Sequence, residues 1–178
     1  MFDSPTPMTP PNGRITLRKP VDADGSDIWE LIAGCQPLDH NSMYCNLLQC
    51  DHFAETCVLA ELDGEVVGWI SGYLVPDDPE TLFIWQVAVS GRARGQGLAQ
   101  RMLGDILDRD ACAGVGRLKT TITRDNAASW ALFRRFAERR GAGLDSTAHF
   151  TRDRHFDGRH ATEHMVTITF AEAMRAAA

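Results

Sequence analysis

The chain has 178 residues and a net charge of −6, from 18 Lys and Arg against 24 Asp and Glu. This length suits one domain with a full hydrophobic core, and the acidic balance disfavours binding to nucleic acid or to an anionic membrane. The sequence has no run of 18 apolar residues and no secretory signal, so we expect a cytoplasmic protein without a transmembrane helix.

The N-terminal third is predicted to contain a leader, a strand and two helices. The first 13 residues hold four of the eight prolines and are expected to be disordered. Residues 15–20 favour a short strand. Apolar residues at helical spacing then predict a helix, for which Asp22 or Asp24 is the expected N-cap. A second, short helix is expected over residues 42–53.

The central third is predicted to form a hairpin, a buried strand and a helix. Asp63-Gly64 lies between two β-rich runs and indicates a hairpin. Residues 76–79 are expected to form the next turn, and the apolar run 81–89 favours a strand covered on both faces. After a glycine-rich turn, an amphipathic helix is expected to begin at Leu98 and to be ended by Gly114 and Gly116.

The C-terminal third completes an α/β (α+β) domain that is expected to span residues 14–170. Strands are predicted over 118–123 and 161–170, with a helix over 127–141 between them. Residues 171–178 form a tail with no clear pattern. The strand–helix–strand crossover should be right-handed and parallel, within a mixed, mostly antiparallel sheet of about six or seven strands with about four helices.

The segment from Val87 to Ala99 carries the clearest chemical signal. A buried strand leads into a glycine-rich turn that opens a helix, and helix N-termini leave backbone N–H groups unpaired. Glycine lets a phosphate approach these groups closely, and Arg92 and Arg94 add positive charge. The spacing fits neither the P-loop nor the Rossmann fingerprint. A diphosphate cradle and an ordinary strand-to-helix turn are the two remaining interpretations.

The pattern Arg94-x-x-Gly97-x-Ala99 resembles the acyl-CoA signature of the GCN5-related N-acetyltransferases (GNAT). The register that begins at Arg92 also fits, although the family's usual spacing favours Arg94. The apolar strand before the turn and the pattern Asn126-Ala-Ala-Ser129 are similar to that family as well. The resemblance implies the GNAT fold, with two splayed parallel strands, and acetyl-CoA as co-substrate without a metal. The residues that it implies for coenzyme binding are Val87, Val89, Arg94, Gly95, Gln96, Gly97, Leu98, Ala99, Asn126 and Ser129.

The resemblance also implies a mechanism of direct acetyl transfer in a ternary complex. A backbone N–H near Val87 would polarise the thioester carbonyl, and a neutral amine would attack it. Many family members have a tyrosine after a leucine in the next helix as the general acid, but this chain has Leu132-Phe133. Because Phe133 cannot donate a proton, three routes remain open: Tyr44, water, or departure of a thiolate, whose conjugate thiol has a pKa of about 8.5.

Three distant segments resemble the L-2,4-diaminobutyrate acetyltransferases of ectoine synthesis, a group within that family. They are residues 37–48, residues 83–89 and the pattern Phe156-x3-His160-x2-Glu163-His164. The resemblance implies transfer of acetyl to the 4-amino group of L-2,4-diaminobutyrate. The substrate-binding residues that it implies are Asp39, Asn41, Tyr44, Trp85, His160 and Glu163. Glu163, Tyr44 and the backbone of Val87 are the catalytic candidates.

Each candidate side chain also has a purely structural interpretation. Asp39 and Asn126 could be helix N-caps, Tyr44 and Trp85 could be packing residues, and His160 with Glu163 could be a solvated pair. Four arginines could form a solvated helix face or reach the 3′-phosphate of coenzyme A. These are Arg134, Arg135, Arg139 and Arg140.

Metal binding is not expected. The five cysteines are an odd number in a chain without a secretory signal, which indicates reduced thiols. They also lack the paired C-x2-C spacing of common structural zinc sites. The group Cys45, Cys50, His52 and Cys57 is the closest approach to a zinc pattern, and the histidines after residue 148 have no ligand spacing.

Two other functions and one assembly remain open at this stage. The protein could acetylate another small amine, or it could be a non-catalytic acyl-CoA-binding module, which the phenylalanine at position 133 would favour. The family resemblance implies a homodimer, formed through the C-terminal strands.

Overall fold

The computed structural model describes residues 13–36 and 38–171. The predicted leader, apart from Gly13, and the tail beyond Ala171 lie outside these residues. The strands are β1 (Thr16–Arg18), β2 (Val58–Leu62), β3 (Glu65–Val75), β4 (Asp78–Val89), β5 (Arg117–Thr123), β6 (Gly143–Phe150) and β7 (Glu163–Thr169). The helices are α1 (Gly25–Ala33), α2 (Met43–His52), α3 (Leu98–Leu107), α4 (Ala127–Arg139) and α5 (Arg152–Phe156). No helix in the described part is long and apolar enough to cross a membrane.

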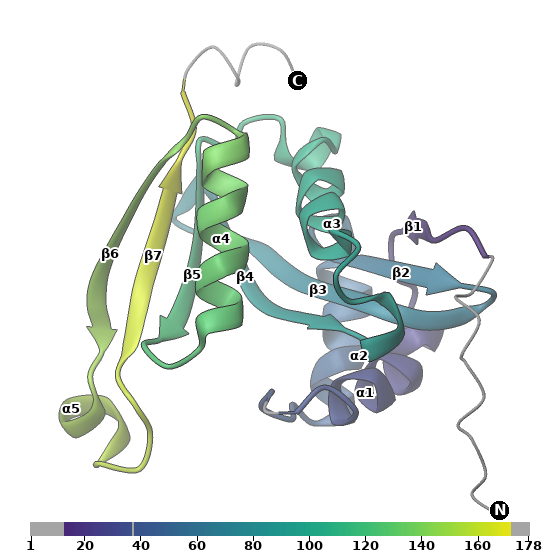
Figure 1. The fold of residues 1–178 in the computed structure, drawn as a ribbon, viewed down its shortest axis with the longest axis horizontal. Coiled ribbons are helices and arrows are strands. Elements are labelled where there is room, and N and C mark those ends of the chain that lie inside the picture. Colours follow the sequence, from purple (N-terminus) through teal and green to yellow (C-terminus); the bar gives the residue numbers. More distant parts are fainter. Residues whose placement is uncertain (1–12, 37, 172–178) are drawn as a thin grey trace, which may run out of the picture.

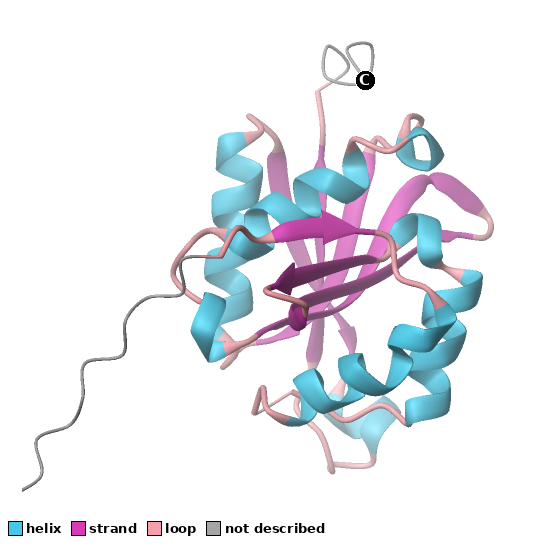
Figure 2. Ribbon diagram, turned by 90° about the vertical axis from the view of Figure 1, so that its right-hand side faces the viewer, coloured by secondary structure: helices cyan, strands magenta, loops and turns pink. Residues whose placement is uncertain are grey.

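The seven strands form one sheet in the order β1-β2-β3-β4-β5-β7-β6. Every neighbouring pair is antiparallel except β4 and β5, which are parallel. The predicted mixed sheet with one parallel pair is therefore confirmed. Helices lie on both sides of the sheet (Figure 2), and β4 and β5 diverge toward one end (Figure 1).

Local sequence explains several of these elements. Asp63 and Gly64 both have positive φ, at 54° and 83°, which is the conformation of the tight hairpin turn that their sequence predicted. The predicted turn over 76–79 is shorter than expected, because β4 already begins at Asp78. Pro79 is tolerated there since it lies close to the start of the strand.

The structure assigns the caps of α1 and α2 and corrects the end of α3. Asp24 occupies the N-cap position of α1, as predicted, but its side chain makes no capping hydrogen bond, because Arg18 holds its carboxylate with two contacts of 2.7 Å. Ser42, rather than Asp39, caps α2 by accepting a hydrogen bond from the N–H of Cys45 at 3.1 Å. The third helix ends at Leu107 instead of Gly114. The short helix α5 had no signal in the sequence.

A β-bulge in β4 determines which of its side chains face the core under α3 and α4. Ser71 of β3 pairs with Gln86, whereas Gly72 pairs with Ile84, so Trp85 is the extra residue. A one-residue shift exchanges the two faces of a strand. Before the bulge, Ile84 packs in the core under α3 and α4, whereas beyond it Val87 packs against that same core. Gln86, which follows Trp85, is itself buried.

The sheet separates two apolar cores. The larger core contains the inward faces of α3 and α4 with the strands beneath them. The smaller core contains Ile28 and Ile32 of α1, Cys50 of α2 and the fully buried Trp69 of β3. Burial of such side chains is the main stabilising contribution. It fixes the positions of β4, α3 and α4, the elements that form the site.

Candidate active site

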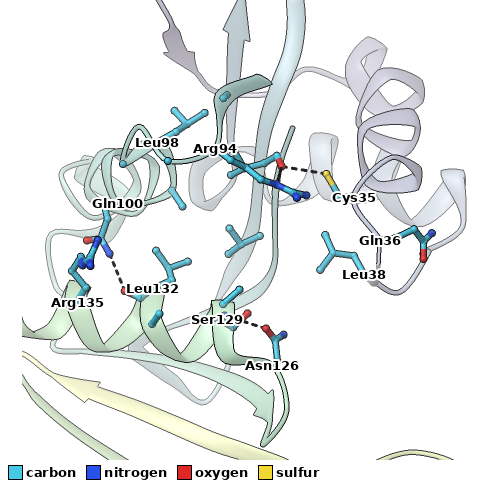
Figure 3. Close-up of a pocket in the computed structure, with 18 residues that line it drawn as sticks. Cys35, Gln36, Leu38, Arg94, Leu98, Gln100, Asn126, Ser129, Leu132 and Arg135 are labelled. Atoms are coloured by element: carbon cyan, nitrogen blue, oxygen red, sulfur yellow. Dashed lines mark hydrogen bonds between the residues drawn. The ribbon is translucent and has the colours of Figure 1, made fainter. Parts of the chain in front are cut away.

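Beyond its first few residues, β4 has no strand partner on the β5 side. The two parallel strands pair only over Thr81–Phe83 and Arg117–Lys119, whereas β5 pairs with β7 along its whole length. A cavity of about 560 Å³ lies beside this opening (Figure 3). It is lined by Cys35, Gln36, Leu38, Val87, Val89, Ala93, Arg94, Gly95, Gly97, Leu98, Ala99, Gln100, Asn126, Ala128, Ser129, Ala131, Leu132 and Arg135.

The glycine-rich turn forms one end of the cavity. Gly95 and Gly97 have φ values of 76° and 70°, which side chains rarely adopt. A Cβ atom at either position would meet nothing within 4 Å, so the space beside the turn is open to a ligand. Gly97 is the N-cap of α3 and provides no side-chain cap. The first N–H groups of α3 are thus available to an anion at the positive end of the helix dipole.

The two arginines of the turn have different partners. Arg92 is ion-paired with Glu65 and does not line the cavity, whereas Arg94 does. The Nε–H of Arg94 donates to the carbonyl of Val89 at 2.9 Å, and the Cys35 thiol donates to the same oxygen at 3.4 Å. The Val89 carbonyl therefore already accepts two hydrogen bonds from side chains of the protein. The arrangement favours the register that begins at Arg94.

Helix α4 forms the opposite wall. Asn126 caps it, since the Asn126 Oδ1 accepts from the N–H of Ser129 at 3.0 Å. Between Asn126 and Leu132, the residues of α4 that line the cavity are small. The Gln100 side chain connects α3 to α4 by donating to the Leu132 carbonyl at 2.8 Å. Arg135 lies at the end of the cavity near Gln100 (Figure 3). Of the four arginines considered for the 3′-phosphate, it alone is among the lining residues of this cavity.

The structure gathers nearly all the residues predicted for coenzyme binding. Nine of the ten line the cavity. Gln96 does not, and its amide instead donates to the carbonyl of Arg92 at 3.3 Å. Sequence reasoning missed Cys35, Leu38 and Gln100, because they come from a loop and a helix face that carry no recognisable motif.

The predicted substrate residues lie outside this cavity, on a second group of elements. Gln86, buried after the bulge, donates from its Nε2 to the backbone carbonyl of Asp39 at 2.9 Å. Its Oε1 accepts from the Asn41 amide at 3.3 Å. Gln86 thereby holds the loop between α1 and α2 against β4. The same loop contributes Leu38 to the cavity, so it adjoins both groups of residues.

Glu163, at the start of β7, is a partly buried carboxylate near the opening. Burial is the main cause that raises its pKa above the usual 4.5, and the negative charge of Asp39 raises it further. His160, whose Nε2 is 3.9 Å from Glu163 Oε1, and a hydrogen bond with Thr121 act in the opposite direction. The Glu163 Oε2 is buried without a hydrogen-bond partner among the described residues. A carboxylate with these properties is suited to accept a proton.

Three other candidates are more exposed. Tyr44 is 68% exposed on the first turn of α2, and it does not line the cavity. Trp85, in the bulge, is 47% exposed and its ring lies 6.5 Å from that of Tyr73. His160 packs on Phe156, with ring centroids 4.7 Å apart. Glu163 thus lies 3.9 Å from His160 and is influenced by the charge of Asp39, whereas Tyr44 lies exposed on α2.

Comparison with known proteins identifies the family. The model of the acetyltransferase (GNAT) family matches residues 26–137. The chain belongs to the GNAT acetyltransferase family. The resemblance seen in the sequence is therefore confirmed. The acyl-CoA signature Arg94-x-x-Gly97-x-Ala99 of this GNAT chain lies in the glycine-rich turn that forms one end of the cavity.

Several relatives of this GNAT chain share one name. The L-2,4-diaminobutyric acid acetyltransferase of Methylotuvimicrobium alcaliphilum is 49% identical over 162 residues, which cover 91% of this chain and 94% of that protein. The enzyme of the same name from Vibrio parahaemolyticus is 48% identical over 158 residues, covering 89% and 87%. The solved structure of diaminobutyrate acetyltransferase EctA from Paenibacillus lautus, in complex with L-2,4-diaminobutyric acid and coenzyme A, superposes with a TM-score of 0.85. It is 39% identical and covers 89% of this chain and 96% of that one.

Phe133 departs from the pattern of many GNAT members, and the structure shows where it points. Its side chain is buried in the core under α4, and the neighbouring Leu132 lines the cavity instead. A hydroxyl at position 133 would therefore enter this core.

The five cysteines are free thiols, four of them buried, and burial raises the pKa of Cys57 to about 12. Over residues 13–36 and 38–171, no three His, Cys, Asp or Glu residues are placed to hold a metal ion.

Asn126→Ala should lower the free energy of unfolding by about 1 kcal/mol, the usual loss on removing an N-cap. Urea denaturation followed by circular dichroism measures this change. Asn126→Asp, which keeps an acceptor for the N–H of Ser129, should restore most of the stability. If Asn126→Ala instead left stability unchanged and weakened coenzyme A binding more than about tenfold, Asn126 would be a direct ligand rather than a cap.

Proposed function

We propose that this protein is an acetyl-CoA-dependent N-acetyltransferase that acetylates the 4-amino group of L-2,4-diaminobutyrate and supplies ectoine biosynthesis. The observation that carries the proposal is the cavity beside the open β4–β5 pair, lined by the glycine-rich turn at the start of α3. The similarity to enzymes of that name supports the substrate. A cytoplasmic location is part of the proposal, because acetyl-CoA is available there.

The cavity supports binding of the coenzyme in an extended form. The turn at Gly95 and Gly97 would receive the diphosphate through backbone N–H groups, and Arg135 would reach a further phosphate at the other end. The main chain of β4 around Val87 has no β5 partner there, so its polar groups can pair with the pantetheine arm. A backbone N–H at this position would stabilise the negative charge that develops on the thioester oxygen.

The carboxylates support binding and deprotonation of a diamine. An amine with a pKa of about 10.4 is mostly protonated at neutral pH, and a second ammonium group on the same substrate lowers that pKa. Asp39 would hold the α-ammonium group, and Glu163 would accept the proton of the 4-ammonium group, directly or through water. The neutral amine then attacks the thioester carbon, and the sulfur leaves as a thiolate that water can protonate. This route needs no side-chain acid at position 133.

An assay of thiol release with acetyl-CoA and several amines tests the proposal. Diaminobutyrate should be turned over more efficiently than ornithine or lysine. Equal or better turnover of ornithine or lysine would contradict the substrate. Coenzyme binding without thiol release for any amine would indicate a non-catalytic acyl-CoA-binding module.

Asp39→Asn should raise the KM for diaminobutyrate about tenfold or more with a smaller change in kcat, since a charge-assisted hydrogen bond contributes about 1.5–3 kcal/mol. The KM for acetyl-CoA should stay constant, because Asp39 does not line the coenzyme cavity. Asp27→Asn, an exposed residue of α1, is the matched control and should leave both constants unchanged. A fall in kcat at constant KM would contradict a binding role for Asp39.

We further propose that the protein is a homodimer formed through its C-terminal strands. β6 is the edge of the sheet and is exposed along almost its whole length. An uncovered edge strand favours pairing with another chain. Asp145, Thr147 and Phe150 pair with Thr167, Met165 and Glu163 and so share the face of β6 that points away from α4, which is the expected contact. Light scattering that shows a monomer at micromolar concentration would contradict this assembly.

A further inference from the structure

A second cavity lies on the other flank of α4. It has a volume of about 650 Å³ and is lined by Arg124, Ala127, Trp130, Ala131, Arg134, Ser146, Ala148 and His164. Ala131 belongs to the walls of both cavities, so the helix itself separates this cavity from the coenzyme cavity. A space of this size can hold a small molecule.

The polar lining of this cavity is cationic. Neither Arg124 nor Arg134 has a carboxylate within 4.0 Å among the described residues. Arg134 lies over the ring of Trp130, 5.1 Å from its centroid. The neighbouring Asp125 does not neutralise Arg124, because its carboxylate interacts with Thr123 and His160. The two guanidinium groups therefore give this cavity a positive charge within a chain whose net charge is −6.

His164 holds Arg124 in place in the same wall. The Nε–H of Arg124 donates to His164 Nε2 at 3.3 Å. An Nε2 that accepts a hydrogen bond leaves the proton of the neutral ring on Nδ1. The Nδ1 atom is buried without a partner among the described residues, and the His164 residue is only 8% exposed. The hydrogen bond to this buried ring therefore fixes the Arg124 guanidinium against the sheet at this wall.

The cavity is also separate from the substrate residues. Successive residues of a strand point to opposite faces, so His164 faces α4 whereas Glu163 faces the other side of the sheet. Ser146 and Ala148 of β6 lie on the α4 side too, because they pair with Val166 and His164. Neither a coenzyme in the first cavity nor an amine beside Glu163 would occupy this space.

We propose that this cavity is a binding site for a small oxyanion, a carboxylate or a phosphate group. Arg124 and Arg134 would supply the charge and donate hydrogen bonds to its oxygens, as guanidinium groups do for both kinds of anion. Ser146 would supply a neutral donor, His164 would hold Arg124 in place, and Trp130 would form an apolar wall for the rest of the molecule. The site is independent of acetyl transfer.

The test uses the full chain saturated with coenzyme A, so that phosphate cannot bind in the first cavity. Phosphate and citrate are titrated separately at constant ionic strength, and the indole N–H signals of the four tryptophans are followed by NMR. Trp130→Phe assigns the Trp130 signal. A saturable shift of that signal is expected with at least one anion, and the tighter of the two identifies the group as phosphate or carboxylate.

Matched variants locate the binding. Arg134→Ala and Arg124→Ala should each weaken it about tenfold, which corresponds to about 1.4 kcal/mol at 25 °C, whereas Arg139→Ala on the same helix should not change it. Thermal denaturation checks that the variants fold. The proposal is overturned if neither anion gives a saturable shift. It is also overturned if the double variant Arg124→Ala/Arg134→Ala binds as the parent does, or if these variants change only the oligomeric state.

Discussion

Glu163→Gln is expected to lower kcat for acetyl transfer to diaminobutyrate by about 10²–10⁴-fold, the usual contribution of a general base. Glutamine keeps the size of the side chain and can still accept a hydrogen bond, but it cannot accept the proton of an ammonium group. The coenzyme should bind as before, because Glu163 does not line the coenzyme cavity. Steady-state kinetics and coenzyme A calorimetry on the same preparation measure the two effects.

The pH dependence gives a second measure of the same role. Activity should rise with pH as Glu163 loses its proton, and the midpoint should lie above 4.5, because burial and the charge of Asp39 raise its pKa. In Glu163→Gln this rise should be absent and the residual rate should follow the pKa of the amine alone. An unchanged pH profile in the variant would show that another group accepts the proton.

Stability should change in the opposite direction to activity. With a raised pKa, Glu163 binds its proton more tightly in the folded chain than in the unfolded chain. Its contribution to the free energy of unfolding is therefore fully present below about pH 4.5 and is lost as the pH rises through the raised value. Glu163→Gln avoids this loss, so at neutral pH it should be at least as stable as the parent. A buried carboxylate that lowers the free energy of unfolding at neutral pH is expected at a functional site.

The turn and the sheet could be predicted because their signals are local. Asp63-Gly64 specifies a hairpin by its backbone conformation, and the glycines at 95 and 97 specify the open turn at the start of α3. The alternation within 161–170 likewise predicts β7. Each of these signals lies within a few residues of the element that it controls.

The position of the coenzyme cavity relative to the substrate residues could not be predicted in the same way. The bulge at Trp85 decides that Val87 faces the coenzyme cavity, but it is visible only in the pairing with β3. The position of Asp39 depends on Gln86, which is 47 residues away in the chain. The cationic cavity beside α4 likewise combines residues of β6, β7 and α4 that share no motif. Such contacts are formed by packing, so only the folded chain shows them.

Gly97→Ala is expected to weaken coenzyme A binding about 100-fold and to leave the kinetic constants of residual turnover largely unchanged at saturating coenzyme. Two physical effects combine. A side chain at a φ of 70° is strained, by about 1–2 kcal/mol. A turn that relaxes this strain no longer directs its N–H groups at the diphosphate, and two lost charge-assisted bonds amount to about 3 kcal/mol or more.

The control for this variant is Gly114→Ala. A Cβ at Gly114 also meets nothing within 4 Å, but its φ lies outside the left-handed range and it does not line the coenzyme cavity. It should bind coenzyme A as the parent does. Calorimetry compares the two variants, and thermal denaturation separates the strain from the loss of binding. If Gly97→Ala bound coenzyme A normally, the diphosphate would have to lie elsewhere, and the proposed orientation of the thioester along β4 would be wrong.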